Sequence, residues 1–469
     1  MRLRAVPAAA ALLGAIGLAA PARAQAVNGR ASVALSGSYN QTFTDDPYPT
    51  KLTQAGPAVS IAPSGVLLID TPLTAHTLTY AFSLSLPFTT DVTLVAAPLQ
   101  YSHRFTYAGR YTLNELTSMS LGTSFSYTPL STLGGSGDPS QTPVDSIPIG
   151  AAATISAGLT EGLTRQLSES SSLTQNTALT FGAPIDPTAV RAKTIGLTNS
   201  LSLSRRFSKD TLGLAAAVGV NFFTAAEGNG GFIDPNTQIT DSLTLNWARP
   251  WTETLNTALS AGLTQVISPD APTPTAVQPT GSLSFTYRRE LSTLTAQYSH
   301  QAMPSLASGS VVFADSATLR FSLPIGQTGL STSGSGGFTH SSPIAGTASS
   351  TLSSPTNVIT SDAALTYKPT FAPTLTASLR GSVQRQVDTG DTMTSFTSVS
   401  FTSGSLTRVT VSLGLTYSYP SATAAQTVPS FPPALGMTGL MPSDVTTSDR
   451  IGVEPDALPE EQPAPATAP

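Results

Sequence analysis

The stretch from Val409 to Tyr419 alternates strictly between apolar and small polar residues. A period of two predicts a β-strand, because successive side chains point to opposite faces of the backbone. The polar face consists of Thr, Ser and Gly, whereas the wet face of a soluble sheet usually carries charge. The apolar face ends in two aromatic residues. This combination predicts a strand that crosses a membrane, with its apolar face toward lipid and its small polar face toward a lumen. The apolar positions are Val409, Val411, Leu413, Leu415, Tyr417 and Tyr419.

The same alternation recurs from residue 30 to residue 419. It is clear at the even positions of 78–88 and 212–222 and at the odd positions of 319–325. Basic residues near short turns recur at spacings of about 40 residues, with one double step of 80 between Arg288 and Lys368. Each repeat holds two strands, which favours hairpins over the four-stranded blades of a propeller. These turn residues are Arg165, Arg205, Arg249, Arg288, Lys368 and Arg408.

The connections between the expected strands alternate in length. Short turns are expected at 205–210, 248–253 and 368–374, and long Pro-, Gly- and Ser-rich connections at 129–148, 268–280 and 340–357. Membrane barrels keep short turns on one side and long loops on the other. The pattern therefore predicts an all-β, antiparallel, up-and-down transmembrane barrel of about 18 strands, with 16 as the runner-up. A surplus strand candidate is expected in 51–98 or after Asp388.

Composition agrees with this architecture. Only 10% of the 469 residues are charged, although 40% are hydrophobic. Beyond the N-terminus there is no apolar run long enough for a transmembrane helix, which needs about 20 residues. A barrel spreads its apolar residues along alternating strand positions, so it needs no such run.

Residues 1–24 have the features of a cleaved secretory signal. Arg2 and Arg4 precede an apolar segment, and Ala22-Arg23-Ala24 matches the small-x-small cleavage pattern. Three domains are therefore expected: the signal at 1–24, the barrel at 25–419 and a disordered tail at 420–469, which is rich in Pro and Ala and carries six acids and one Arg. No basic patch is present, so a nucleic-acid partner is not expected.

On these features the region 27–419 resembles the outer-membrane β-barrel superfamily of Gram-negative bacteria. Repeated hairpins with Ser/Thr-rich faces are also similar to barrels found in exopolysaccharide secretion loci. The resemblance implies a location in the outer membrane, contact with its lipid and lipopolysaccharide, and insertion by the barrel-assembly machinery. A periplasmic partner for the acidic tail is a further expectation.

Six arginines are expected to face the lumen, because each occupies a position opposite the apolar face of its strand. The clearest is Arg320, which lies between Leu319 and Phe321. An Arg on the lipid face at mid-depth would cost about 2–4 kcal/mol. The hypothesis is a mildly basic lumen, with Glu290 and Asp362 as its best candidate acids. The alternative of structural arginines near the rim is favoured, because several lie beside turns. The six are Arg104, Arg206, Arg288, Arg320, Arg380 and Arg408.

Aromatic residues are expected where strands meet the membrane interface, at Trp247, Trp251, Tyr417 and Tyr419. His103 and His300 are expected on the lipid face as well. No nucleophile, base and acid stand at a recognisable spacing, and neither a metal-ligand pattern nor a cysteine is present. The protein is therefore expected not to be an enzyme and to need no cofactor or metal.

The predicted function is an outer-membrane channel for small or polyhydroxylated solutes, since a barrel of 16 or more strands leaves a water-filled lumen. Residues 129–148 or 340–357 are candidates for a loop that folds inward and narrows it. The alternative transport function is a conduit for exopolysaccharide export. An alternative of another class is a structural or adhesive β-rich surface protein.

Overall fold

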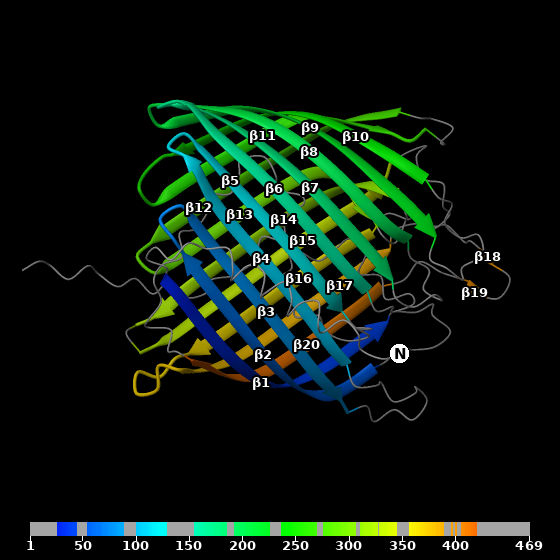
Figure 1. The fold of residues 1–469 in the computed structure, drawn as a ribbon. Coiled ribbons are helices and arrows are strands. Elements are labelled where there is room, and N and C mark those ends of the chain that lie inside the picture. The colour runs from blue at the N-terminus through cyan, green and yellow to red at the C-terminus, as the bar shows by residue number, and fades with distance from the viewer. Residues whose placement is uncertain are drawn as a thin grey trace, which may run out of the picture.

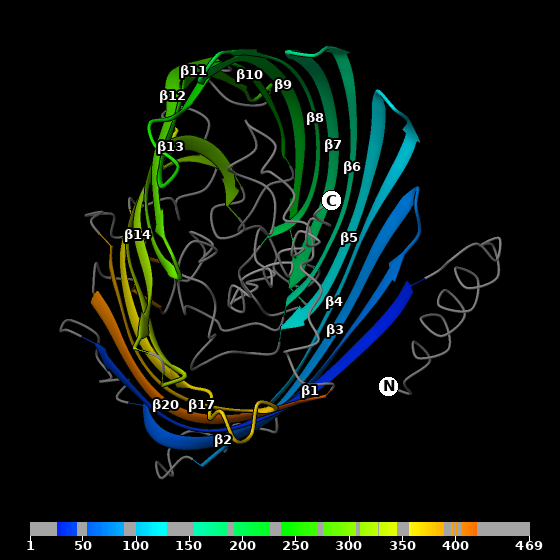
Figure 2. The ribbon, with the colours of Figure 1, turned by 90° about the vertical axis from the view of Figure 1, so that its left-hand side faces the viewer.

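The computed structural model describes residues 26–44, 54–88, 100–128, 154–184, 192–225, 236–269, 275–305, 310–326, 328–344, 356–388, 395–396, 399–400 and 405–419. Eighteen strands form one closed antiparallel barrel, in which each strand pairs with the next along the chain (Figures 1 and 2). The expected fold class and strand number are confirmed. The strands are β1 (Ala26–Thr44), β2 (Gln54–Asp70), β3 (Thr74–Pro87), β4 (Gln100–Asn114), β5 (Thr117–Thr128), β6 (Thr154–Ser168), β7 (Ser171–Pro184), β8 (Ala192–Phe207), β9 (Asp210–Ala225), β10 (Asn236–Pro250), β11 (Leu255–Ile267), β12 (Thr275–Arg289), β13 (Ser292–Ser305), β14 (Ser310–Ile325), β15 (Leu330–Pro343), β16 (Thr356–Tyr367), β17 (Leu375–Asp388) and β20 (Ser405–Tyr419).

The barrel closes between its first and last strands. β1 pairs with β2 along one edge and with β20 along the other, where Ala31 lies opposite Tyr419. β17 pairs directly with β20. The intervening β18 (Ser395–Phe396) and β19 (Val399–Ser400) form a separate small hairpin. The region after Asp388, where a surplus strand was expected, therefore adds only one strand to the barrel.

The alternation along each strand separates the two surfaces of the barrel. In β20, Leu413 and Leu415 are 65% and 45% exposed on the convex outer face, while Ser412 and Gly414 point to the concave inner face. The register carries this division from strand to strand, since Leu413 lies opposite Leu379 and Leu415 opposite Leu35. Large apolar side chains therefore cover the outside of the barrel, and small polar ones line the inside.

Short turns gather at one end of the barrel, which we call the short-turn end, and both Ala26 and Tyr419 belong to this end. Two turns use left-handed backbone at a non-glycine residue, Ser208 (φ 52°) and Glu290 (φ 51°). The opposite end, which we call the long-loop end, holds the longer connections. Strand β12 begins at Thr275, so 275–280 belongs to a strand and not to the connection expected there.

In the described part of the chain, no helix is long and apolar enough to span a membrane. The expected barrel domain corresponds to the strands between Ala26 and Tyr419. The expected signal at 1–24 and the expected tail at 420–469 lie outside the described residues.

Candidate functional site

The inner wall of the barrel is lined by hydroxyl groups that pair across neighbouring strands. Ser32 and Ser64 lie 2.6 Å apart through their Oγ atoms, and the same contact recurs at five other places on the described wall. In each pair one hydroxyl donates to the other, which leaves the second O–H and the remaining lone pairs free for water or solute. The wall is thus uncharged, polar and wettable over much of its area. The further pairs are Ser36–Ser60 (2.6 Å), Ser83–Ser102 (2.5 Å), Ser126–Ser156 (2.7 Å), Ser172–Ser204 (2.8 Å) and Ser260–Ser282 (2.8 Å).

One group of charged residues crosses the inner wall from β14 to β17. Arg320 lies opposite Ser335, and Ser335 lies opposite Asp362. The Ser335 hydroxyl donates a hydrogen bond to the Asp362 carboxylate, and Arg380 Nη2 lies 3.4 Å from Asp362 Oδ2. Two guanidinium groups therefore share this part of the wall with one carboxylate, so the cluster is net positive.

The other four arginines of the predicted set also occupy inner-face positions, but they are spread around the barrel. Arg104 lies opposite Ser126, toward the long-loop end of β4, and is exposed. Arg206 and Arg288 lie beside turns at the short-turn end, at the rim position expected of structural arginines. Arg206 Nε lies 3.4 Å from the carbonyl oxygen of Ser208. Arg408 lies near the opposite end, across from Gln384. Only Arg320 and Arg380 are brought together.

Glu290, expected to be an acid of the inner wall, lies instead in the turn between β12 and β13. The strand pair ends at Arg289 and Ser292, so a two-residue turn takes up Glu290 and Leu291. Asp362 is the acid that stays on the wall.

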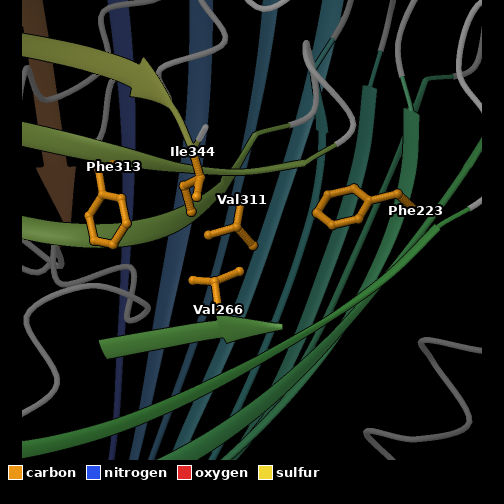
Figure 3. Packing of buried hydrophobic residues seen from close by; sticks show 5 residues of the cluster. All are labelled: Phe223, Val266, Val311, Phe313 and Ile344. Atoms are coloured by element: carbon orange, nitrogen blue, oxygen red, sulfur yellow. The ribbon is translucent and has the colours of Figure 1, made fainter. Parts of the chain in front are cut away.

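At the long-loop end the wall folds inward. Phe223, Val266, Val311, Phe313 and Ile344 form a buried apolar cluster inside the barrel (Figure 3). Phe223 and Val266 come from the inner faces of β9 and β11. Val311 and Phe313 come from the start of β14, which lies across the lumen side of those strands (Figure 3). The lumen is therefore narrowed by wall strands.

The inward fold is also fixed by a buried polar residue. Gln238, on the inner face of β10, is fully buried, and its side-chain oxygen accepts a hydrogen bond from the backbone N–H of Val311. A buried amide needs such a partner, because an unsatisfied one costs about 1–3 kcal/mol. Ile344 lies within the 340–357 stretch expected to fold inward. Residues 345–355 and the other candidate, 129–148, lie outside the described residues.

Sequence reasoning missed Gln238 and the start of β14. A signal was present: Val311, Val312, Phe313 and Ala314 are four apolar residues in succession, and all four are buried. A strand of a membrane barrel should alternate, so an unbroken apolar run indicates contact with protein on both faces.

The predicted interface aromatics lie at the short-turn end. Trp247 and Trp251 form an edge-to-face pair with ring centroids 6.3 Å apart, and the Arg249 guanidinium lies 4.4 Å from the Trp251 ring. Trp247 Nε1 donates to Asp210 at 2.9 Å. Tyr417 and Tyr419 are exposed on the outer face of β20 at the same end.

The histidines pair with neighbours on the outer face. His103 Nδ1 lies 2.8 Å from the Tyr80 hydroxyl, and His300 Nδ1 lies 2.8 Å from Asp315 Oδ1. Tyr298 also donates to Asp315, at 2.6 Å. Among the residues described, no three His, Asp or Glu side chains gather closely enough to hold a metal ion.

The sequence matches no protein-family model and no curated protein. Solved structures are similar at low identity. OccK9 (OpdG) of Pseudomonas aeruginosa is 13% identical with a TM-score of 0.41, covering 83% of this chain and 98% of that one. OccK2 (OpdF) of the same organism, in complex with glucuronate, is 14% identical with a TM-score of 0.41 and the same coverage. OccAB4 of Acinetobacter baumannii is 11% identical with a TM-score of 0.39, again covering 83% and 98%.

Proposed function

We propose that the protein is an outer-membrane channel that passes small, polar solutes through the lumen of its barrel, with a preference for anionic or polyhydroxylated ones. The observation that carries this proposal is the division of the closed 18-stranded wall into an apolar outside and a hydroxyl-lined inside. A barrel of 16–18 strands is wide enough to hold a water-filled passage.

The outer surface supports a membrane location. Leucine side chains on strands around the barrel are each more than half exposed, such as Leu243 and Leu263 on the paired β10 and β11 and Leu413 on β20. Contiguous apolar surface of this extent is not stable in water, and soluble proteins seldom expose more than a few hundred Å² of it in one patch. The rival function of a water-soluble adhesive assembly is disfavoured for this reason.

The preference for anionic solutes rests on Arg320 and Arg380, which share the inner wall with Asp362 as the only acid in their cluster. Guanidinium groups bind carboxylates through parallel hydrogen bonds, and fixed positive charge in a narrow passage favours anions. The neighbouring serine and threonine hydroxyls supply donors and acceptors for a hydroxylated solute.

The test is planar-bilayer conductance of the refolded protein, with reversal potentials measured in a salt gradient. A conducting, anion-preferring pore is expected, and Arg320→Ser should lower the anion preference. The matched control is Arg205→Ser, which removes the same charge from the outer face, where Arg205 lies 5.0 Å from the Phe207 ring. Cation preference in the native pore, or equal effects of the two variants, would remove the proposed selectivity. Lack of conductance would remove the channel itself.

A further inference from the structure

The hydrogen-bonded ladder between β12 and β13 stops before the long-loop end. Its last pair in that direction is Gly281 opposite His300. Strand β12 nevertheless continues beside β11 to Thr275, and β13 continues beside β14 to Ser305. The wall is therefore split over this stretch, because each margin is paired on one side only.

Two prolines explain why the ladder stops there. The N–H of Arg288 donates to the carbonyl of Thr254 on the β11 side. Backbone groups alternate in direction along a strand, so the odd-numbered residues of β12 direct their N–H toward β13. Residue 279 is one of these odd-numbered positions, but it is a proline and has no N–H to donate to β13.

The unused part of the register contains a second proline. If the β12–β13 pairing continued at the same register, Pro279 would lie opposite Ala302 and Val277 opposite Pro304. Both would be pairs that normally exchange two hydrogen bonds, and each would keep only one. This part of β13 can therefore pair with β12 and rejoin the wall, but these two residue pairs would form only half of their usual backbone hydrogen bonds.

We define the tip as residues 301–305 of β13 and 310–314 of β14. In the structure the tip lies inside the barrel, held by the apolar cluster and by the hydrogen bond to Gln238. The tip residues Ala302, Val311 and Phe313 lie on the face of β13 and β14 that points outward nearer the short-turn end. In the tip this face packs instead against the inner faces of β9, β11 and β12. The tip therefore overlaps the wall from within, beside an unfilled β12 edge.

We propose that the tip is a gate with two positions. This proposal rests on the proposed channel function. In the tucked position it packs on Phe223, Val266 and Gln238 and narrows the lumen. In the wall position it continues the β12–β13 ladder past Gly281 and His300, which clears the lumen. The prolines weaken the wall position enough for a small apolar cluster to compete with it.

The chain contains no cysteine, so each position can be trapped by one engineered pair. Val266→Cys with Val311→Cys joins residues that are packed together in the tucked position. Gln278→Cys with Met303→Cys joins two inner-wall positions three residues past the end of the ladder, which lie opposite each other only in the wall position. Ser282→Cys with Ser299→Cys, paired in the continuous ladder, is the matched control.

The pairs are oxidised in proteoliposomes and the remaining free thiols are counted by maleimide labelling and mass spectrometry, followed by bilayer recording. We expect all three disulfides to form, the 278–303 pair more slowly than the control. The 278–303 disulfide should raise conductance, the 266–311 disulfide should lower it, and reduction should reverse both. The control disulfide should leave conductance unchanged.

Free thiols at 278 and 303 after complete oxidation of the control would overturn the two positions. A 278–303 disulfide that leaves conductance unchanged would overturn the gate. Thiol labelling does not depend on ion conduction. If the protein does not conduct, the channel function is refuted, but the labelling still shows whether the tip moves. If Val311→Cys does not fold, Pro279→Ala with Pro304→Ala restores the missing N–H groups, and it should speed 278–303 disulfide formation several-fold; an unchanged rate would contradict the proposal.

Discussion

Arg380 and Asp362 form an ion pair between β17 and β16 on the inner wall, with 3.4 Å between Nη2 and Oδ2. The Ser335 hydroxyl of β15 bonds the same carboxylate. Asp362 is therefore held by side chains from both neighbouring strands, and it offsets part of the positive charge that Arg320 and Arg380 bring to the lumen.

Replacing Asp362 by Asn should increase the preference of the pore for anions. One unit charge acting over about 4–8 Å in water is worth ~0.5–1 kcal/mol, so the anion-to-cation permeability ratio should rise about two- to five-fold. Reversal potentials in a salt gradient measure this ratio. Glu161→Gln, which removes an acid from the outer face, is the control and should have no effect. A fall in anion preference with Asp362→Asn would contradict the assigned position of the charge.

The bond between Trp247 and Asp210 should contribute to stability at the short-turn end. Trp247→Phe keeps an aromatic ring and loses the Nε1 donor, so it should cost about 0.5–1.5 kcal/mol of unfolding free energy. A double-mutant cycle with Asp210→Ala, measured by denaturant unfolding in lipid vesicles, should give a coupling energy of the same size. Additive effects of the two changes would show that the contact contributes nothing.

Glu161 is an acid on the outer face of β6, exposed between Leu159 and Leu163, and it makes no hydrogen bond or ion pair with the residues that the structure describes. Basic residues facing lipid at mid-depth cost about 2–4 kcal/mol and acids less, so Glu161→Leu should stabilise the protein by about 1–2 kcal/mol. Unfolding in vesicles tests this. Destabilisation would mean that Glu161 meets a polar partner instead of lipid.

Gly262 is required by the close approach of β10. A Cβ there would clash with the carbonyl oxygen of Leu243, which is backbone and cannot move aside alone. Gly262→Ala should therefore cost about 1–3 kcal/mol through overpacking. Gly37→Ala is the matched control, because a Cβ at Gly37 meets nothing within 4 Å. Equal stability of the two variants would contradict the close approach.

The sequence carried the fold because the membrane imposes one rule on nearly every strand. Leu319, Arg320 and Phe321 show it in three residues: the two apolar side chains are outside and the arginine is inside. The rule gives the strands, their faces and their approximate number. It says nothing about which inner-face residues become neighbours, since the register is set by turns whose geometry is not visible in the pattern. Arg320, Ser335 and Asp362 are far apart in the chain and adjacent on the wall.

The inward fold could not be predicted because its residues depart from that rule. Residues 268–280 resemble a loop because they are rich in proline and small polar residues, although a proline such as Pro279 is also tolerated on a strand edge that has lost its partner. The run from Val311 to Ala314 marks strands covered by protein on both sides, but periodicity alone does not identify the covering element. That element is β9–β11, which contributes the apolar side chains of Phe223 and Val266 and the buried amide of Gln238.

The pairing of β1 with β20 has a consequence for biogenesis. The strand that completes the barrel, β20, is also the last barrel strand to be synthesised, so a shorter nascent chain cannot form a closed barrel. A polypeptide that ends before residue 405 would leave β1 and β17 with bare margins, ready to recruit strands from other molecules. Whatever receives this chain during insertion must shield both margins until the C-terminal strand arrives.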